Sequence, residues 1–329
     1  MKRTTHTMSL VFATLASTAV LAHAQYTAYY VGPGLAYGIN SFGTVVGFGD
    51  NGDAFSYTIG GGMNQIFYQG PACGINDSGT IVGGSYGWTI PPWTYSSGVL
   101  TYISLSGASS AYGIAYAINN SGTVVGEGQV TGGFSCSGGV VTYLSGFLSA
   151  RAINNSGTIV GQSGSGQACI YSGGQATGIG LQYGCAYGIN NSGTIVGGTY
   201  AYEAVSQAFS YSGGAITYII PPIPGQETSP SAALGINDSG TIVGYYSGGP
   251  FSYSDGQVTA LSPFLASIGL TGGEATAIND NGDIVGWASE DGNYQAFLLV
   301  PTEVPEPSTG ALVALGSAGL ICRTLRRRR

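Results

Sequence analysis

One twelve-residue pattern occurs seven times in this chain of 329 residues, and it limits the fold more than any other feature. The pattern reads Ala-x-[Gly/Ala]-Ile-Asn-x-x-Gly-x-[Ile/Val]-Val-Gly, with successive copies 36, 43, 35, 36, 47 and 42 residues apart. Its Asn is found at Asn40, Asn76, Asn119, Asn154, Asn190, Asn237 and Asn279. Tandem copies of this length predict a stacked array in which each repeat covers the apolar flank of its neighbour.

The pattern itself predicts a β-hairpin. Asn favours the first position of a type I turn, and the Gly three residues later favours the left-handed backbone that follows such a turn. Asn154 to Gly157 shows the usual filling, Asn-Asn-Ser-Gly, and the Thr-Ile-Val-Gly that follows supplies β-branched residues for a second strand. Turn chemistry also accounts for the five Asn-x-Ser sequences, which otherwise resemble glycosylation acceptors.

A second half-motif follows each hairpin, as in Phe55-Ser-Tyr57 and Phe209-Ser-Tyr211. In six repeats a Gly-containing turn then leads to another apolar strand, so each repeat holds about four strands, as a β-propeller blade does. The seventh repeat ends at Leu299-Val300 without its fourth strand, whereas Tyr26–Val31 is a spare apolar segment at the start. We therefore expect an all-β, seven-bladed β-propeller-like ring over residues 25–301, closed by the N-terminal strand. A solenoid or a sandwich is the alternative.

Charge excludes one class of function. Between Gln25 and Pro301 the chain has thirteen acidic residues and a single basic one, Arg151, for a net charge of −12. Nucleic-acid binding requires several Lys or Arg against the phosphates, so we expect no nucleic-acid partner. Both histidines, His6 and His23, precede this body, and its lack of His and Lys excludes histidine-based nucleophile systems and Schiff-base lysines. We therefore expect a protein that is not an enzyme.

The N-terminus has the features of a secretory signal peptide, which we expect to form a helix over residues 1–24. A basic start is followed by the apolar run Met8–Leu21, and Ala22-His23-Ala24 is a small-x-small cleavage site. Cleavage would leave Gln25 as the first mature residue. An uncleaved membrane anchor is the alternative, although the run is short for a span of about 20 apolar residues.

The C-terminus, residues 302–329, has three parts in order. Val304, Pro305, Glu306 and Pro307 precede an apolar segment, Thr309–Cys322, and a closing arginine cluster. An apolar helix followed by arginines is a stop-transfer pattern and predicts a transmembrane helix. The three parts together resemble a PEP-CTERM sorting signal. That resemblance implies a Gram-negative bacterium, cleavage near the Pro-Glu-Pro by an exosortase as partner, and delivery to the cell surface or the exopolysaccharide matrix, with membrane contact only through this helix before processing. A plain membrane anchor is the alternative.

The repeat also resembles a family of extracellular repeats known as HAF repeats, over Ala36–Leu299. This resemblance supports export and supplies no catalytic residues. The sequence therefore predicts an exported scaffold or binding module for exopolysaccharide or surface proteins.

One variable position is the best candidate for a ligand surface. It is the second residue of the pattern, filled by Tyr37, Cys73, Tyr116, Arg151, Tyr187, Leu234 and Thr276. In a ring these residues would lie at equivalent heights around the axis. Tyr37, Tyr116 and Tyr187 with Arg151 could then stack on sugar rings, because aromatic faces combine apolar area with a polar handle. Packing between neighbouring repeats is the alternative.

The sequence offers two further kinds of candidate site. The oxygen-rich segments around Asp50 and Asp53, and around Asp280 and Asp283, are weak candidates for Ca²⁺, because neither has EF-hand spacing; no other cofactor is expected. The alternative function is a carbohydrate-active enzyme that works through two carboxylates. The candidates for these carboxylates are Glu127, Glu203 and Glu274.

The body also contains four cysteines, Cys73, Cys136, Cys169 and Cys185. Cys136 and Cys169 stand where other repeats have aromatic residues, which favours small core side chains over disulfides.

Overall fold

The structure is a computed structural model, and it describes residues 25–67, 69–85, 90–105, 112–200, 206–219 and 230–302. The predicted signal peptide, residues 1–24, and the predicted sorting segment with its transmembrane helix, from residue 303 on, lie outside these ranges. Residues Tyr26–Thr302 form one compact unit, whose last strand extends one residue beyond the predicted end at 301. Within the described ranges, the structure contains no helix of the length and apolarity that a membrane span needs.

Five of the repeats each form a separate four-stranded antiparallel sheet in chain order. The second repeat has β5 (Ala72–Ile75), β6 (Ile81–Gly83), β7 (Trp93–Ser96) and β8 (Val99–Tyr102). The third has β9 (Gly113–Ile118), β10 (Val124–Gly128), β11 (Gly132–Ser137) and β12 (Val140–Tyr143). The fourth has β13 (Phe147–Ile153), β14 (Ile159–Ser163), β15 (Ala168–Ser172) and β16 (Gln175–Gly178). The fifth has β17 (Gly184–Ile189), β18 (Ile195–Thr199), β19 (Ala208–Ser212) and β20 (Ala215–Tyr218). The sixth has β21 (Ser231–Ile236), β22 (Ile242–Tyr246), β23 (Gly249–Ser254) and β24 (Gln257–Ala260).

The first and seventh repeats share one seven-stranded sheet of order β25-β26-β27-β1-β2-β3-β4. Its strands are β1 (Gln25–Ile39), β2 (Val45–Gly49), β3 (Ala54–Thr58), β4 (Gly62–Phe67), β25 (Thr271–Ile278), β26 (Ile284–Glu290) and β27 (Asn293–Thr302). Strand β1 is long enough to serve both repeats. Its second half, Gly34–Ile39, pairs with β2, whereas Tyr30 in its first half donates a hydrogen bond to Oε1 of Gln295 on β27 at 2.8 Å.

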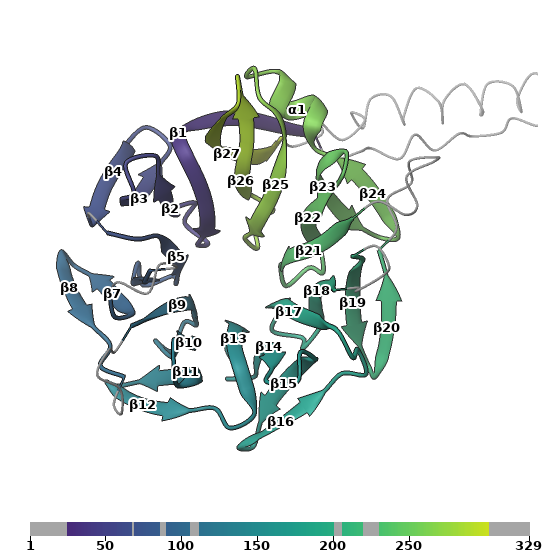
Figure 1. The fold of residues 1–329 in the computed structure, drawn as a ribbon. Helices are drawn as coiled ribbons and strands as arrows, with labels where there is room; N and C mark the ends of the chain where they lie inside the picture. Colours follow the sequence, from purple (N-terminus) through teal and green to yellow (C-terminus); the bar gives the residue numbers. More distant parts are fainter. Residues whose placement is uncertain are drawn as a thin grey trace, which may run out of the picture. The chain divides into compact units, whose positions relative to one another are not determined.

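The N-terminal segment therefore supplies the strand that the seventh repeat lacks, as the sequence predicts. Figure 1 shows the sheets arranged in a circle around a common centre, with β1 between β27 and β2. Gly34 allows the change of partner: its φ is 125°, and a Cβ at this position would lie 2.2 Å from the carbonyl oxygen of Phe48, so only glycine fits. No edge of the first and last repeats is left open at this junction.

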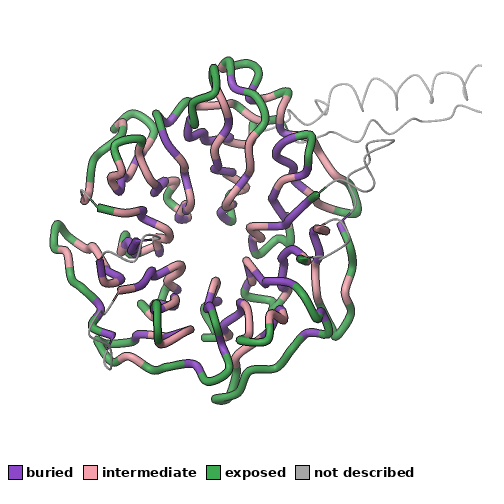
Figure 2. Tube along the Cα trace, in the orientation of Figure 1, coloured by how far each residue is buried: buried purple, intermediate pink, exposed green. Residues whose placement is uncertain are grey.

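The apolar core is divided among the junctions between neighbouring repeats, as the buried segments in Figure 2 indicate. At one junction Val82 of the second repeat packs against Ala115, Val124 and Phe134 of the third. The closing junction repeats this arrangement with Val285 against Ala36, Val45 and Phe55, and adds Ala296 and Leu298 of β27. Each repeat thus covers the flank of the next, which is the packing that a tandem array requires.

The repeated glycines explain why the aromatic half-motif follows the hairpin. In the third repeat Gly126 lies opposite Phe134, and a Cβ on Gly126 would lie 2.8 Å from Cζ of that ring and 2.1 Å from the carbonyl oxygen of Ile114. The aromatic ring therefore occupies the space that a larger residue would need.

One element was not predicted. A five-residue helix, α1 (Ser262–Ala266), lies between β24 and β25, with Leu265 buried in the core and Phe264 in edge contact with Tyr26.

Candidate ligand-binding cavity

The seven variable residues share a backbone feature that the sequence did not reveal. In the innermost strand of every repeat, the pairing register shifts at the variable residue, as it does at Tyr37 between the paired Ala36 and Gly38. The same irregularity falls at the variable residue of each other repeat. A β-bulge leaves one residue out of the ladder and re-aims its side chain. Seven equivalent bulges therefore present seven variable side chains to the centre of the ring.

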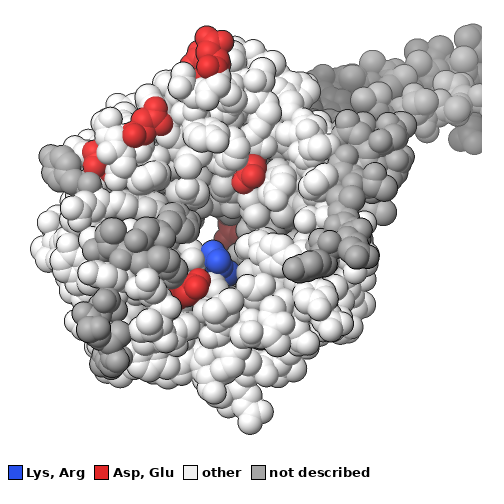
Figure 3. Space-filling view, in the orientation of Figure 1, with Lys and Arg blue, Asp and Glu red and all other residues white. Residues whose placement is uncertain are grey.

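These side chains line one cavity of about 470 Å³, which we call the axial cavity. It brings together all four predicted ligand-surface residues with three further variable residues and two residues of the seventh repeat: Tyr37, Cys73, Tyr116, Arg151, Tyr187, Leu234, Glu274, Thr276 and Trp287. Figure 3 shows the central hollow with basic and acidic atoms at its wall. The basic atoms belong to Arg151, because it is the only Lys or Arg between residues 25 and 302.

Arg151 is held on one side of the axial cavity by two groups of the third repeat. Its Cζ lies 4.1 Å from the centroid of the Tyr116 ring, and its Nη2 lies 3.9 Å from Oε2 of Glu127. The Tyr116 hydroxyl donates to the same Glu127 oxygen at 3.3 Å. Burial raises the pKa of the Tyr116 hydroxyl, so that it stays a neutral donor. The cluster presents an aromatic face, a guanidinium and a carboxylate whose charges balance.

The fifth repeat contributes Tyr187 to the axial cavity and holds a second tyrosine beside it, Tyr200, which the sequence does not single out. Tyr187 and Tyr200 share a short hydrogen bond between their hydroxyls. Burial raises the pKa of both hydroxyls, and it raises the pKa of the neighbouring Cys185 thiol to about 11. Tyr200 follows β18 directly, and the repeat pattern does not mark it, because its position lies beyond the twelve conserved residues and is Tyr only in the second and fifth repeats.

Glu274 and Trp287 occupy the other side of the axial cavity, paired across β25 and β26. Burial raises the pKa of the Glu274 carboxyl above its ordinary value, and a hydrogen bond from the Trp287 side chain lowers it in part. Tyr37 and Tyr245 lie close enough for the Glu274 charge to raise the pKa of their hydroxyls further, beyond the effect of burial. The candidate carboxylates Glu127 and Glu274 thus belong to the surroundings of the same cavity, whereas Glu203 lies outside the described residues.

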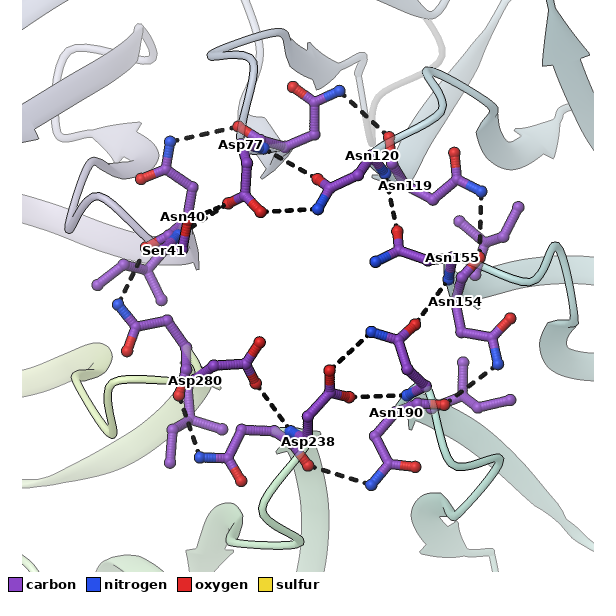
Figure 4. Close-up of a pocket in the computed structure, with 18 of the residues that line it drawn as sticks. Asn40, Ser41, Asp77, Asn119, Asn120, Asn154, Asn155, Asn190, Asp238 and Asp280 are labelled. Carbon is purple, nitrogen blue, oxygen red and sulfur yellow. Dashed lines mark hydrogen bonds between the residues drawn. The ribbon is translucent and has the colours of Figure 1, made fainter.

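The repeated Asn forms a second, separate structure on the axis. In each repeat its side-chain Nδ2 donates to the backbone carbonyl of the Asn in the next repeat, at 3.0 to 3.3 Å. The last of these bonds runs from Asn279 to Asn40 and closes the circle. Its Oδ1 caps the turn, as Asn154 Oδ1 accepts from the Thr158 amide at 2.9 Å. We call this circle of seven residues the Asn ring, and Figure 4 shows it.

The residue after each Asn adds a second layer of hydrogen bonds. Asn120, for example, donates through its backbone amide to Asn155 and through its side chain to Asp77. Burial would raise the pKa of the Asp77 carboxyl, but hydrogen bonds from Ser41 and Asn120 outweigh it and hold that pKa below its ordinary value. These residues line a polar cavity of about 180 Å³ at the Asn ring.

The polar cavity and the axial cavity have one set of residues in common. These are the seven repeated isoleucines, which lie between the bulge and the Asn in each innermost strand: Ile39, Ile75, Ile118, Ile153, Ile189, Ile236 and Ile278. A circle of seven isoleucine side chains therefore lies between the polar cavity and the axial cavity.

The two segments with weak calcium candidates lie in different places in the structure. Asp50 and Asp53 line a hollow beside β4, where the Gln65 side chain donates to Asp53, whereas Asp280 belongs to the second layer of the polar cavity. Asp283 accepts a hydrogen bond from the Asn279 side chain at 2.8 Å. Among the described residues there is no group of three or more His, Cys, Asp or Glu suited to a metal ion.

Three of the four body cysteines are buried, and none of the four forms a disulfide in the described part of the chain. Cys136 and Cys169 belong to the cores between repeats, as their positions in the half-motif predict. Burial raises the pKa of the Cys169 thiol to about 12. Cys73, in contrast, is half-buried and lines the axial cavity.

Comparison with known proteins identifies one segment and one fold. Residues 303–329 match the family described as the PEP-CTERM protein-sorting motif. The chain is similar to the solved structure titled "YCF48 bound to D1 peptide", with a TM-score of 0.54 and 13% identity over 86% of this chain and 99% of that chain. A structural-genomics protein of unknown function from Bacteroides thetaiotaomicron gives a TM-score of 0.48 and 9% identity over 84% of this chain and 76% of that chain. No curated protein matches.

Two conclusions follow from these matches. The sorting motif marks an exported protein that an exosortase processes and that is sorted to the cell surface of a Gram-negative bacterium. The likeness to the YCF48 structure, together with the repeated four-stranded sheets, defines a propeller-like all-β fold and carries nothing about a ligand.

Proposed function

We propose that this protein is a seven-bladed β-propeller that binds a glycan of the exopolysaccharide matrix in its axial cavity, without changing it chemically. The observation that carries the proposal is the set of seven bulges, which direct the variable residues of all repeats into one cavity. The amino acid at the bulge, which lines the cavity, differs among the repeats, whereas the residues that pack one repeat on the next are nearly the same in all seven. The resemblance to HAF repeats and the predicted signal peptide fit an extracellular role.

The chemistry of the axial cavity suits a sugar. Its volume of about 470 Å³ lies in the range typical of small-ligand sites, roughly 300 to 1,000 Å³. Trp287, Tyr37 and Tyr187 offer aromatic faces with polar edges, which is the combination that a pyranose ring needs. Arg151 and Glu127 add a donor and an acceptor with nearly no net charge.

A glycan array with the purified full-length protein tests this proposal. We expect retention on one or more neutral or amino-sugar glycans, and we expect Tyr37→Ala to weaken it about tenfold through the loss of one aromatic face. The matched control is Tyr218→Ala, since Tyr218 lies exposed on the outer strand β20. Equal retention by both variants, or no retention by the wild type, would contradict glycan binding in the axial cavity.

Carbohydrate hydrolysis is a second candidate, because one carboxyl group, Glu274, lines the axial cavity and another, Glu127, contacts the cavity residues Arg151 and Tyr116. Burial raises the pKa of Glu274, as a general acid requires, whereas Glu127 forms an ion pair with Arg151. Release of reducing sugar from a bound oligosaccharide, lost in both Glu274→Gln and Glu127→Gln, would support hydrolysis. Retention without release would favour the binding module.

A further inference from the structure

The charges around the axial cavity are balanced on one side only. Arg151 is the only basic side chain among the described residues, and it forms an ion pair with Glu127 of the third repeat. Glu274 belongs to the seventh repeat, three repeats away from Arg151 in one direction around the ring and four in the other. Among the described residues, therefore, no basic side chain forms an ion pair with Glu274.

The groups that face Glu274 are neutral. The Trp287 side chain donates a hydrogen bond to its carboxyl, and the hydroxyls of Tyr37 and Tyr245 lie near it. A half-buried carboxylate without a cation is costly, because burial removes part of its hydration. A ligand that brought a positive charge to this side of the cavity would offset that cost.

We propose that the axial cavity recognises an amino sugar, whose ammonium group binds the Glu274 carboxylate between Trp287 and Tyr37. This inference rests on the proposed glycan binding and specifies its ligand class. A charge-assisted hydrogen bond is about twice as strong as a neutral one, and aromatic faces attract an ammonium further. The net charge of −12 over residues 25–301 draws cationic sugars to the protein and disfavours uronic acids and sulfated glycans.

Two oligosaccharides that differ only at the nitrogen test the proposal. Titration calorimetry of the full-length protein at about pH 6, where sugar amines are protonated, compares chitotetraose with tetra-N-acetylchitotetraose. We expect the free amine to bind about tenfold more tightly or better, the gain typical of one hydrogen bond to a charged group. In Glu274→Gln we expect the ratio of the two dissociation constants to fall toward one.

Glu290→Gln is the matched control, because it removes the same charge from an exposed position at the end of β26. It should keep the preference for the amine. If both variants lose the preference equally, general attraction to an acidic protein explains it and the assignment to Glu274 is overturned.

The remaining outcomes separate this inference from the function on which it rests. Equal or tighter binding of the N-acetylated sugar overturns the amino-sugar inference and leaves glycan binding standing. Failure of both sugars to bind at millimolar concentration contradicts both. The wild-type comparison decides between these outcomes without any variant, so the folding of Glu274→Gln does not limit the test.

Discussion

The Asn ring and the axial cavity are built by the same seven strands, only three residues apart, and they follow opposite rules. Every repeat has Asn in the ring, with the same two bonds to its own turn and to the next repeat. At the bulge the residue differs among repeats, from Tyr187 to Leu234 to Thr276.

This difference distinguishes the residues that hold the ring together from the residues that line its cavity. A contact that links each repeat to an identical neighbour recurs in all of them, because every junction of the ring needs the same donor and acceptor. A side chain that points from a bulge into a shared cavity has no counterpart that must match it. The uniform Asn positions therefore link the repeats into the ring, and the varied positions line the cavity in which we propose that the ligand binds.

The largest effect should come from a uniform glycine. In Gly126→Ala the new Cβ would lie 2.1 Å from the carbonyl oxygen of Ile114 and 2.8 Å from the Phe134 ring. Because a backbone carbonyl cannot move aside, we expect a loss of at least about 3 kcal/mol in the free energy of unfolding, measured by urea denaturation. Gly164→Ala is the control, since its Cβ would meet nothing within 4 Å. Comparable losses in both variants would contradict the packing described here.

A smaller loss in the free energy of unfolding is expected when a residue of the Asn ring is replaced. Asn154→Ala removes the donor to the Asn190 carbonyl and the acceptor for the Thr158 amide, inside a buried site. We expect a cost of about 2 to 3 kcal/mol, because buried partners are left unsatisfied. Asn155→Ala, at the exposed neighbouring position in the second layer, should cost less than about 1 kcal/mol. Thermal and urea unfolding of the two variants compare the ring with its second layer directly.

The smallest expected effect is a change in melting temperature when Glu274, which lines the axial cavity, is replaced. Because the pKa of Glu274 is raised above 4.5 in the folded protein, the folded state holds this proton more tightly than the unfolded chain does. Stability from this group is present below pH 4.5 and is lost as the pH rises through the raised pKa. Glu274→Gln should therefore melt about 1 to 2 °C higher than the wild type at neutral pH and equally at about pH 4. A lower melting temperature at neutral pH would contradict this interpretation.

Much of the fold could be predicted from the repeat, because its signals are local. Asn at the start of a turn and Gly at its end define the hairpin, and in the structure Gly157 has a φ of 85° and donates to the Asn154 carbonyl. The complementary ends of the array predict the pairing of Tyr26–Val31 with the seventh repeat.

The cavity could be predicted only in part, because its remaining features depend on register and on contacts between repeats. Periodicity placed the variable residues at one height, but the bulge that turns Tyr187 toward the axis depends on strand pairing. The sequence predicts that the Asn occupies the first position of its own turn, whereas its bond to the next repeat has no local signal. Trp287 lies in a second strand and Tyr200 directly after one, and both stand beyond the last residue of the repeat pattern.

The fifth repeat offers the most direct test, since it contains one residue of each kind, Tyr187 and Asn190. Unfolding free energy and glycan-array retention are measured for Tyr187→Ala and Asn190→Ala. We predict that Tyr187→Ala loses retention with a stability change of about 1 kcal/mol or less, and that Asn190→Ala loses about 2 to 3 kcal/mol and keeps retention while folded. If both variants lose the same property to the same extent, the separation between closure and ligand binding is contradicted.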